Sequence, residues 1–199
     1  MLDNAQARSL AATIIEPAAR GLLRVGLTPD MVTWLGALAV IANAIFVIAP
    51  GHWVLGAVLY GLLGLSDVLD GTMARLSGTS GNWGAFLDST LDRVVDAAVL
   101  IAIAMFYYEH PQQNWILLTI LIALTAGQLT SYIRARAEAV GATCRVGFAE
   151  RAERSIILWL GMLLTGLGLN VLPFALVILA VASTITVAQR IVHVRKQLV

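Results

Sequence analysis

The chain has 199 residues, of which 59% are hydrophobic and 13% charged, with a net charge of +1. A soluble domain of this size carries about 25% charged and about 45–50% apolar residues, so this chain has too few polar groups to cover its surface. The composition argues against an ordinary soluble protein and predicts one surrounded by lipid. A single cysteine, Cys144, excludes an internal disulfide and a cluster of metal-binding thiolates.

The N-terminal segment, residues 3–26, has the pattern of an amphipathic helix. Apolar pairs recur every four residues, at Leu10/Ala11, Ile14/Ile15, Ala18/Ala19 and Leu22/Leu23, and another face carries Arg8, Glu16, Arg20 and Arg24. A helix with one apolar stripe and one charged face is typical of segments that lie in the plane of the membrane interface. We expect this helix to lie along the cytoplasmic surface.

Six later segments are apolar enough to cross a hydrocarbon core of about 30 Å, which needs roughly 20 residues per helix. They are Met31–Ala49, Trp53–Arg75, Trp83–Tyr108, Trp115–Ala139, Glu150–Leu169 and Pro173–Lys196. All 13 lysines and arginines fall on or near one side of these spans, and the three connections on the other side carry none. The positive-inside rule therefore predicts that both termini are cytoplasmic. We expect an all-α integral membrane protein of the cell (inner) membrane, with six transmembrane helices (31–196) in one domain (1–199).

The first span begins with two candidate helix caps. Either Thr28 caps the helix with Pro29 at its first position, or Asp30 caps it with Thr33 three residues later.

Aspartates occur in the second and third spans, where a charge at mid-bilayer costs about 2.5–3.5 kcal/mol or more. They are Asp67, Asp70, Asp88, Asp92 and Asp96. Spacings of three and four place the first two on one helix face and the next two on another, and a short loop can bring these faces together. Converging carboxylates need a cation, and their hard oxygens favour Mg²⁺, Mn²⁺ or Ca²⁺ over zinc. The alternative is a polar relay, or pairing with Arg75 and Arg93. We interpret Asp96 as a supporting residue or a hydrogen bonder between helices.

Residues 67–92 read DVLDGTMARLSGTSGNWGAFLDSTLD and contain the pattern D-x2-D-G-x2-A-R-x8-G-x3-D-x3-D. This pattern resembles the signature of the CDP-alcohol phosphotransferases, a family of membrane enzymes with six transmembrane helices. The span count and orientation extend the resemblance over the whole chain.

The resemblance implies a role for each matching residue. Asp67, Asp70 and Asp88 would hold Mg²⁺, or Mn²⁺, against the diphosphate of a CDP-linked lipid, and Asp92 would be both metal ligand and general base. The residues implied at the CDP-lipid are Asp30, Met31, Val32, Thr33, Gly71, Ala74, Arg75 and Gly81. The residues alone also allow a packing role for Gly71, extension of Arg75 to the interface, and close helix approach at Gly84.

Arginines flank the cytoplasmic ends of the last three spans and predict an anion site, because guanidinium groups bind phosphate in a bidentate manner. The segments SYIRARAE (131–138) and ERAER (150–154) resemble the phosphatidylinositol phosphate synthases of actinobacteria and the archaetidylinositol phosphate synthases of archaea, although Arg134 stands where a lysine is common. The resemblance implies inositol phosphate as acceptor, CDP-diacylglycerol as donor and a homodimer. The predicted acceptor-phosphate residues are Ser131, Arg134, Arg151, Arg154 and Arg190.

Two alternatives remain at this stage. Glycerol 3-phosphate is also an anion, so a phosphatidylglycerophosphate synthase fits the arginines equally well. A cation transporter would explain the intramembrane aspartates, but it would not explain the spacing of Gly71, Ala74, Arg75 and Gly84.

Overall fold

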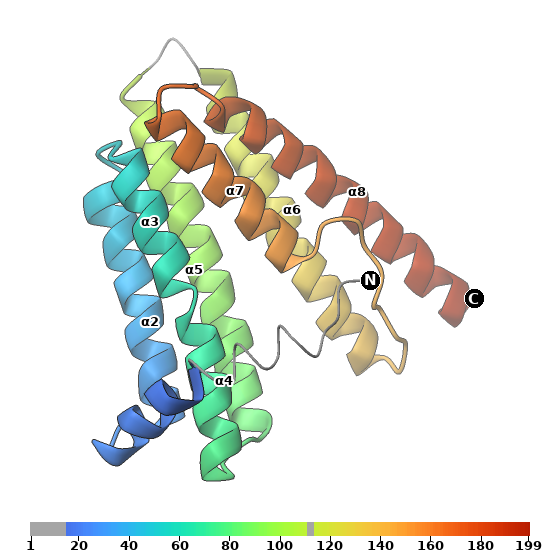
Figure 1. The fold of residues 1–199 in the computed structure, drawn as a ribbon. Coiled ribbons are helices and arrows are strands. Elements are labelled where there is room, and N and C mark those ends of the chain that lie inside the picture. Colours follow the sequence, from blue (N-terminus) through green and yellow to red (C-terminus); the bar gives the residue numbers. More distant parts are fainter. Residues whose placement is uncertain (1–14, 111–113) are drawn as a thin grey trace, which may run out of the picture. The chain divides into compact units, whose positions relative to one another are not determined.

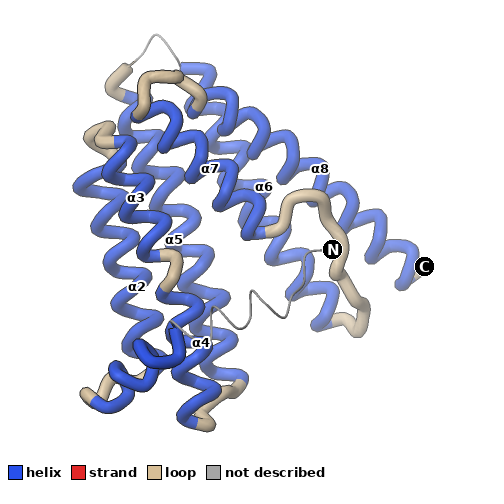
Figure 2. Tube along the Cα trace, in the orientation of Figure 1, coloured by secondary structure: helices blue, strands red, loops and turns tan. Residues whose placement is uncertain are grey.

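The computed structural model describes residues 15–110 and 114–199, and every regular element in these ranges is a helix (Figures 1 and 2). Residues 15–24 are helical. The labelled elements follow in the order α2 (Pro29–Asn43), η1 (Ala44–Ile48), α3 (Trp53–Leu63), α4 (Ser66–Ser77), α5 (Asn82–Tyr108), α6 (Asn114–Ala139), α7 (Arg151–Gly166) and α8 (Leu172–Leu198). The π-helical turn η1 directly continues α2.

Within the described residues, four helical stretches are long and apolar enough to cross a membrane, which indicates a membrane protein. They are Pro29–Ile48, Trp53–Ser77, Asn114–Ala139 and Leu172–Leu198, and each matches a predicted span. The other two predicted spans correspond to α5, whose first half carries charged residues, and to α7, which has 16 residues.

The second predicted span is interrupted. Helix α3 ends at Leu63, and α4 begins at Ser66, whose hydroxyl donates to the Leu63 carbonyl over 2.6 Å. Gly64 lies at the break and is a poor helix former. Helix α4 ends at Ser77, and the following Gly78 has φ 68, the left-handed conformation that commonly terminates helices. The break places the first two aspartates in a short helix of their own.

The described chain forms two compact units. The first contains residues up to Ala42 together with Leu59–Val95. In this unit α2 and α4 approach closely at Gly36. A Cβ atom at this position would lie 2.8 Å from the Ser66 Cβ atom, so the approach requires glycine. Its small core contains Ala19, Val32 and Met73, with Leu22 and Leu23 packed against them. The predicted amphipathic helix (3–26) therefore packs part of its apolar stripe against protein, while residues 3–14 lie outside the described residues.

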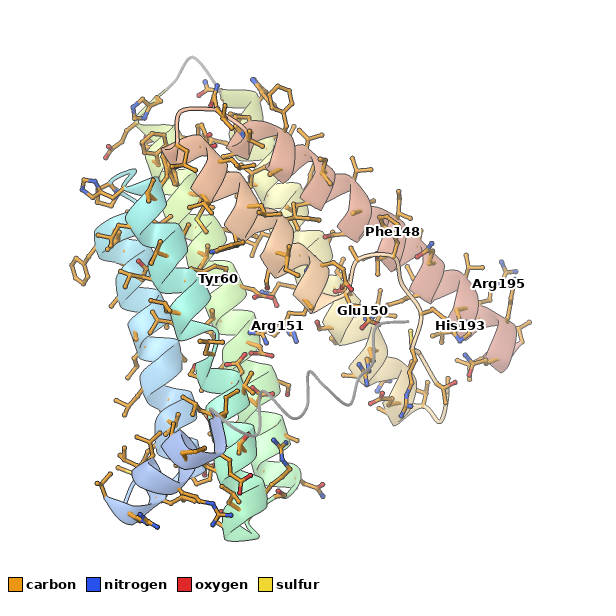
Figure 3. All side chains as sticks on the ribbon, viewed as in Figure 1. Tyr60, Phe148, Glu150, Arg151, His193 and Arg195 are labelled. Atoms are coloured by element: carbon orange, nitrogen blue, oxygen red, sulfur yellow. The ribbon has the colours of Figure 1, made fainter. Side chains whose placement is uncertain are left out.

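The second unit contains Asn43–Val58 and Asp96–Val199. Helix α8 packs along α6 and against α7, and the Trp159 indole N–H of α7 donates to the Ala57 carbonyl of α3 over 2.9 Å. Two hydrogen bonds connect the loop between α6 and α7 to α8. The Ala149 N–H donates to Thr186 Oγ1 over 3.0 Å, and the Phe148 N–H donates to Gln189 Oε1 over 3.1 Å. This loop leads into α7, which begins beside the labelled Glu150 and Arg151 in Figure 3.

Candidate active site

The start of α2 uses the first of the two predicted caps. Thr28 Oγ1 accepts a hydrogen bond from the Met31 N–H over 3.3 Å, and Pro29 is the first helical residue. The carboxylate of Asp30 is thereby available for another partner. Its Oδ2 atom accepts a hydrogen bond from the Trp83 indole N–H over 2.8 Å, which connects the start of α2 to the start of α5.

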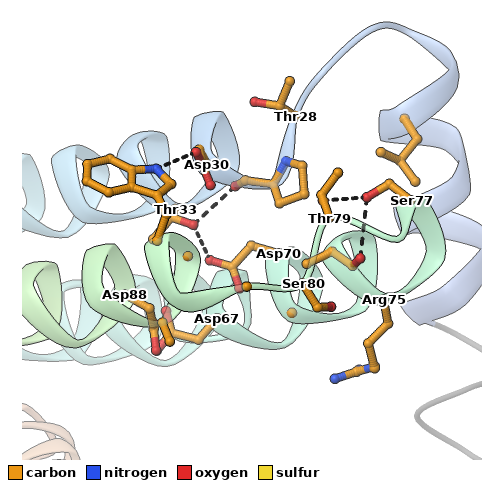
Figure 4. Close-up of a pocket in the computed structure, with 18 of the residues that line it drawn as sticks. Thr28, Asp30, Thr33, Asp67, Asp70, Arg75, Ser77, Thr79, Ser80 and Asp88 are labelled. Atoms are coloured by element: carbon orange, nitrogen blue, oxygen red, sulfur yellow. Dashed lines mark hydrogen bonds between the residues drawn. The ribbon is translucent and has the colours of Figure 1, made fainter.

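A cavity of about 700 Å³ lies in the first unit (Figure 4). Its walls come from the start of α2, from α4, from the loop 78–81 and from the start of α5. Six of the eight residues predicted to contact the CDP-lipid line it, namely Asp30, Thr33, Gly71, Ala74, Arg75 and Gly81. The structure does not place Met31 or Val32 on this cavity. Met31 is exposed, and Val32 turns into the core beside Ala19 and Met73.

Both motif glycines that line the cavity present open backbone to it. A Cβ atom on Gly71 would meet only the Arg75 side chain, at 3.8 Å, and one on Gly84 would meet nothing within 4 Å. The prediction that Gly84 allows two helices to approach closely is therefore wrong. Packing within the protein therefore requires glycine at neither position, and backbone without a side chain would let a ligand come close.

Three of the predicted metal ligands gather in the first unit. Carboxylate oxygens of Asp67, Asp88 and Asp92 all lie within 4.8 Å of one another, and Asp92 is only 9% exposed. Asp67 comes from α4, and the other two come from α5. The spacing argument therefore predicted correctly that the two helix faces meet.

Asp70, the fourth predicted ligand, is not part of this group in the structure. It is 7% exposed, and its Oδ2 atom accepts a hydrogen bond from Thr33 Oγ1 over 2.6 Å (Figure 4). The same hydroxyl lies 3.1 Å from the Pro29 carbonyl. The much shorter distance to Asp70 identifies the carboxylate as the principal acceptor of the single hydroxyl proton.

The acid group suits a hard divalent cation. Three carboxylates within 4.8 Å provide oxygen ligands only, and cations such as Mg²⁺ and Mn²⁺ prefer these ligands. The carboxylates repel one another in a partly buried site, so a cation between them would be strongly favoured. The residues present therefore fit a divalent metal.

The predicted arginines divide into two groups in the second unit. Arg151, Arg154 and Arg190 are held by other residues of this unit, whereas Arg134 is half-exposed and pairs with Glu138 on its own helix, with Nε to Oε1 at 3.2 Å. Ser131 is partly buried on α6. Three of the five predicted acceptor residues, Arg151, Arg154 and Arg190, are thus connected through shared partners.

Thr130 is the centre of this arrangement. Its hydroxyl accepts a hydrogen bond from Arg154 Nη1 over 3.1 Å, and its carbonyl accepts one from Arg190 Nη1. Arg190 also donates from Nε to the Val146 carbonyl over 2.8 Å, and its Nη2 atom lies 3.9 Å from Glu150 Oε1. These contacts fix two buried arginines to the loop and to α6.

Sequence reasoning missed Trp83 and Thr130. Trp83 lies in the first turn of α5, directly before Gly84, and an aromatic residue at that place is a signal for a nucleotide contact. Thr130 precedes the predicted Ser131, but nothing in its sequence context indicates that it joins two arginines.

Comparison with known proteins places these features in a family. The chain matches the CDP-alcohol phosphatidyltransferase family over residues 26–192. It is 40% identical over 202 residues to the phosphatidylinositol phosphate synthase of Streptomyces avermitilis, covering 98% of this chain and 83% of that protein.

Two solved structures are also similar. The crystal structure of Mycobacterium tuberculosis phosphatidylinositol phosphate synthase with CDP-DAG bound has a TM-score of 0.88 and 42% identity, covering 92% of this chain and 94% of that chain. The structure of the same enzyme with manganese and citrate has a TM-score of 0.88 and 41% identity, covering 92% and 89%. With its signature, its acid group and these similarities, the chain belongs to the CDP-alcohol phosphatidyltransferase family of enzymes.

Proposed function

We propose that this enzyme transfers a phosphatidyl group from CDP-diacylglycerol to 1D-myo-inositol 3-phosphate, releasing CMP and forming phosphatidylinositol phosphate. The observation that carries the proposal is the acid group of Asp67, Asp88 and Asp92, which belongs to the same unit as a cavity lined by the signature residues. Relatives about 40% identical over nearly the whole chain bear the name of this activity.

In the proposed reaction, Asp92 acts as the general base. Its carboxylate takes the proton from the acceptor hydroxyl, whose oxygen attacks the β-phosphorus of the donor. The bond from that phosphorus to the bridging oxygen breaks, and CMP leaves with the bridging oxygen. A divalent cation, Mg²⁺ in our proposal, would neutralise the diphosphate and improve CMP as a leaving group when bound by Asp67, Asp70, Asp88 and Asp92.

The cavity residues would bind the nucleotide end of the donor. Arg75 can pair with phosphate or ribose, and Gly71 and Ala74 allow the nucleotide to approach α4 closely. Asp30 and Thr33 lie on the α2 side, and Gly81 lies on the loop side. Arg151, Arg154, Arg190, Ser131 and Arg134 are proposed for the acceptor phosphate.

The membrane arrangement is part of the proposal. Helices α5 and α7 would complete six spans, with both termini and the active site on the cytoplasmic side of the cell membrane and the N-terminal helix along that surface. The charge bias of the connections supports this orientation. We further propose that the enzyme works as a single-domain homodimer, and the family match over residues 26–192 supports one domain.

The acceptor is tested by offering each candidate alcohol separately. Purified protein in detergent receives CDP-diacylglycerol and Mg²⁺ with inositol phosphate, free inositol or glycerol 3-phosphate, and the lipid product is identified by mass spectrometry. We expect a phosphorylated inositol lipid and stoichiometric CMP. A glycerophosphate lipid as the main product would overturn the acceptor assignment, and CMP release without lipid product would overturn the transfer reaction.

A further inference from the structure

Asp96 makes contacts that the metal site does not explain. It follows Asp92 by four residues in α5, yet its two carboxylate oxygens are directed to arginines of α7. Oδ1 lies 3.8 Å from Arg151 Nε, and Oδ2 lies 3.5 Å from Arg154 Nη2. The exposed fractions of these side chains are 19% for Asp96, 34% for Arg151 and 9% for Arg154.

The electrostatics of this cluster depend on the carboxylate. Arg151 and Arg154 are three residues apart and therefore project from one face of α7. Two guanidinium groups on one partly buried face repel each other, since the interaction between charges is much stronger there than in water. One carboxylate that offers an oxygen to each can hold both in a single arrangement.

Arg154 is fixed from a second side. Its Nη1 atom donates to Thr130 Oγ1 over 3.1 Å, and the Thr130 hydroxyl donates its own proton to the Gly127 carbonyl over 2.7 Å. The hydroxyl is therefore oriented as an acceptor. Arg154 is thus held between Asp96 and Thr130, while the more exposed Arg151 is held by Asp96 at the first turn of α7.

We propose that Asp96 is a positioning residue of the acceptor site, which holds Arg151 and Arg154 in the orientation that receives the acceptor's phosphate. This inference rests on the proposed function. Asp96 does not touch the substrate, and its role differs from that of Asp88 and Asp92 on the same helix. It sets the affinity for a phosphomonoester, whereas those residues serve the metal and the donor.

Asp96→Asn tests the proposal, because the amide keeps the shape of the side chain but places an N–H₂ group against a guanidinium. We expect the KM for inositol phosphate to rise about tenfold or more, with changes of about twofold or less in the KM for CDP-diacylglycerol. Inhibition by inorganic phosphate should weaken by the same factor, since phosphate occupies the same anion site. Asp96→Glu restores the charge and should recover part of the lost affinity.

Glu16→Gln is the matched control, since it removes the carboxylate that pairs with Arg20 at an exposed position, with Nη2 to Oε1 at 2.6 Å. It should change neither KM. Thr130→Val provides an independent variant if Asp96→Asn does not fold, and it should raise the KM for inositol phosphate about threefold by releasing one side of Arg154.

The outcomes separate the two proposals. Equal rises in both KM values, or a lower melting temperature with an unchanged KM for the acceptor, would show that Asp96 only supports helix packing. If the wild-type protein forms no phosphorylated inositol lipid, the proposed function fails. Binding of inorganic phosphate to wild type and Asp96→Asn, measured by calorimetry, then still decides whether Asp96 positions an anion site.

Discussion

The two units of this enzyme handle buried charge in opposite ways. In the first, carboxylates of Asp67, Asp88 and Asp92 converge on one another within 4.8 Å. In the second, the buried Arg154 and Arg190 alternate with groups that complement them, namely Asp96, Glu150, Thr130 and the Val146 carbonyl. Convergence of like charges favours a cation between them, whereas each buried arginine lies against groups that complement its charge.

This difference predicts different consequences for substitution. A residue of the acid group should act on the chemical step, because in the proposed reaction its charge would meet the metal and the reacting atoms. A residue of the arginine group should act on acceptor affinity and on stability together, because each arginine also holds the fold. The following substitutions test whether the two units differ in this way.

The largest effect is expected at Asp92. Asp92→Asn removes the proposed base, and CMP release from CDP-diacylglycerol and inositol phosphate should fall about 10³-fold, within the usual range of general-base contributions. We expect the melting temperature to stay close to that of the wild type, and this measurement would confirm that the fold is intact. A rate within tenfold of the wild type would reassign the base.

A smaller but distinctive effect is expected at Arg154. Arg154→Gln leaves the mostly buried Asp96 without one of its arginine contacts, so we expect a lower melting temperature together with a rise of about 30-fold in the KM for inositol phosphate. Arg134→Gln is the contrasting variant, because Arg134 is half-exposed and forms its ion pair with Glu138 on the same helix. Its KM should change about threefold at most. Equal effects at both positions would contradict the division of the arginines.

Substitution of Thr33 tests whether Asp70 contributes to metal binding together with the acid group. Thr33→Val removes the hydroxyl that donates to Asp70 over 2.6 Å, and we expect Mn²⁺ affinity, measured by electron paramagnetic resonance, to change about fivefold. Thr33→Ser keeps the hydroxyl and should behave like the wild type. Unchanged Mn²⁺ affinity in Thr33→Val would separate Asp70 from the metal site.

The smallest effect is expected at Trp83. Trp83→Phe keeps an aromatic ring but removes the N–H that donates to Asp30 over 2.8 Å. The KM for CDP-diacylglycerol should rise about threefold, while the KM for inositol phosphate should stay unchanged. An equal rise in both would mean that this hydrogen bond supports the fold rather than the donor site.

Much of the candidate site could be predicted because its determinants are local in sequence. The spacings of three and four along two helices placed Asp67, Asp88 and Asp92 correctly on faces that meet. The same argument could not predict that Asp70 would turn to Thr33, which lies 37 residues away. It also could not choose between Thr28 and Asp30 as the cap, since both satisfy the local pattern.

The helical class, four of the six predicted spans and the meeting of Asp67, Asp88 and Asp92 could be predicted from the amino-acid sequence, because hydropathy and helical periodicity are properties of neighbouring residues. The partners of Asp30, Asp70, Asp96 and Arg190 depend on the tertiary structure. Each of these contacts joins segments far apart in the chain, such as Thr130 and Arg190 at a separation of 60 residues. Such contacts depend on how the helices pack. They could not be predicted from the pattern along any one helix, because packing is set by many side chains at once.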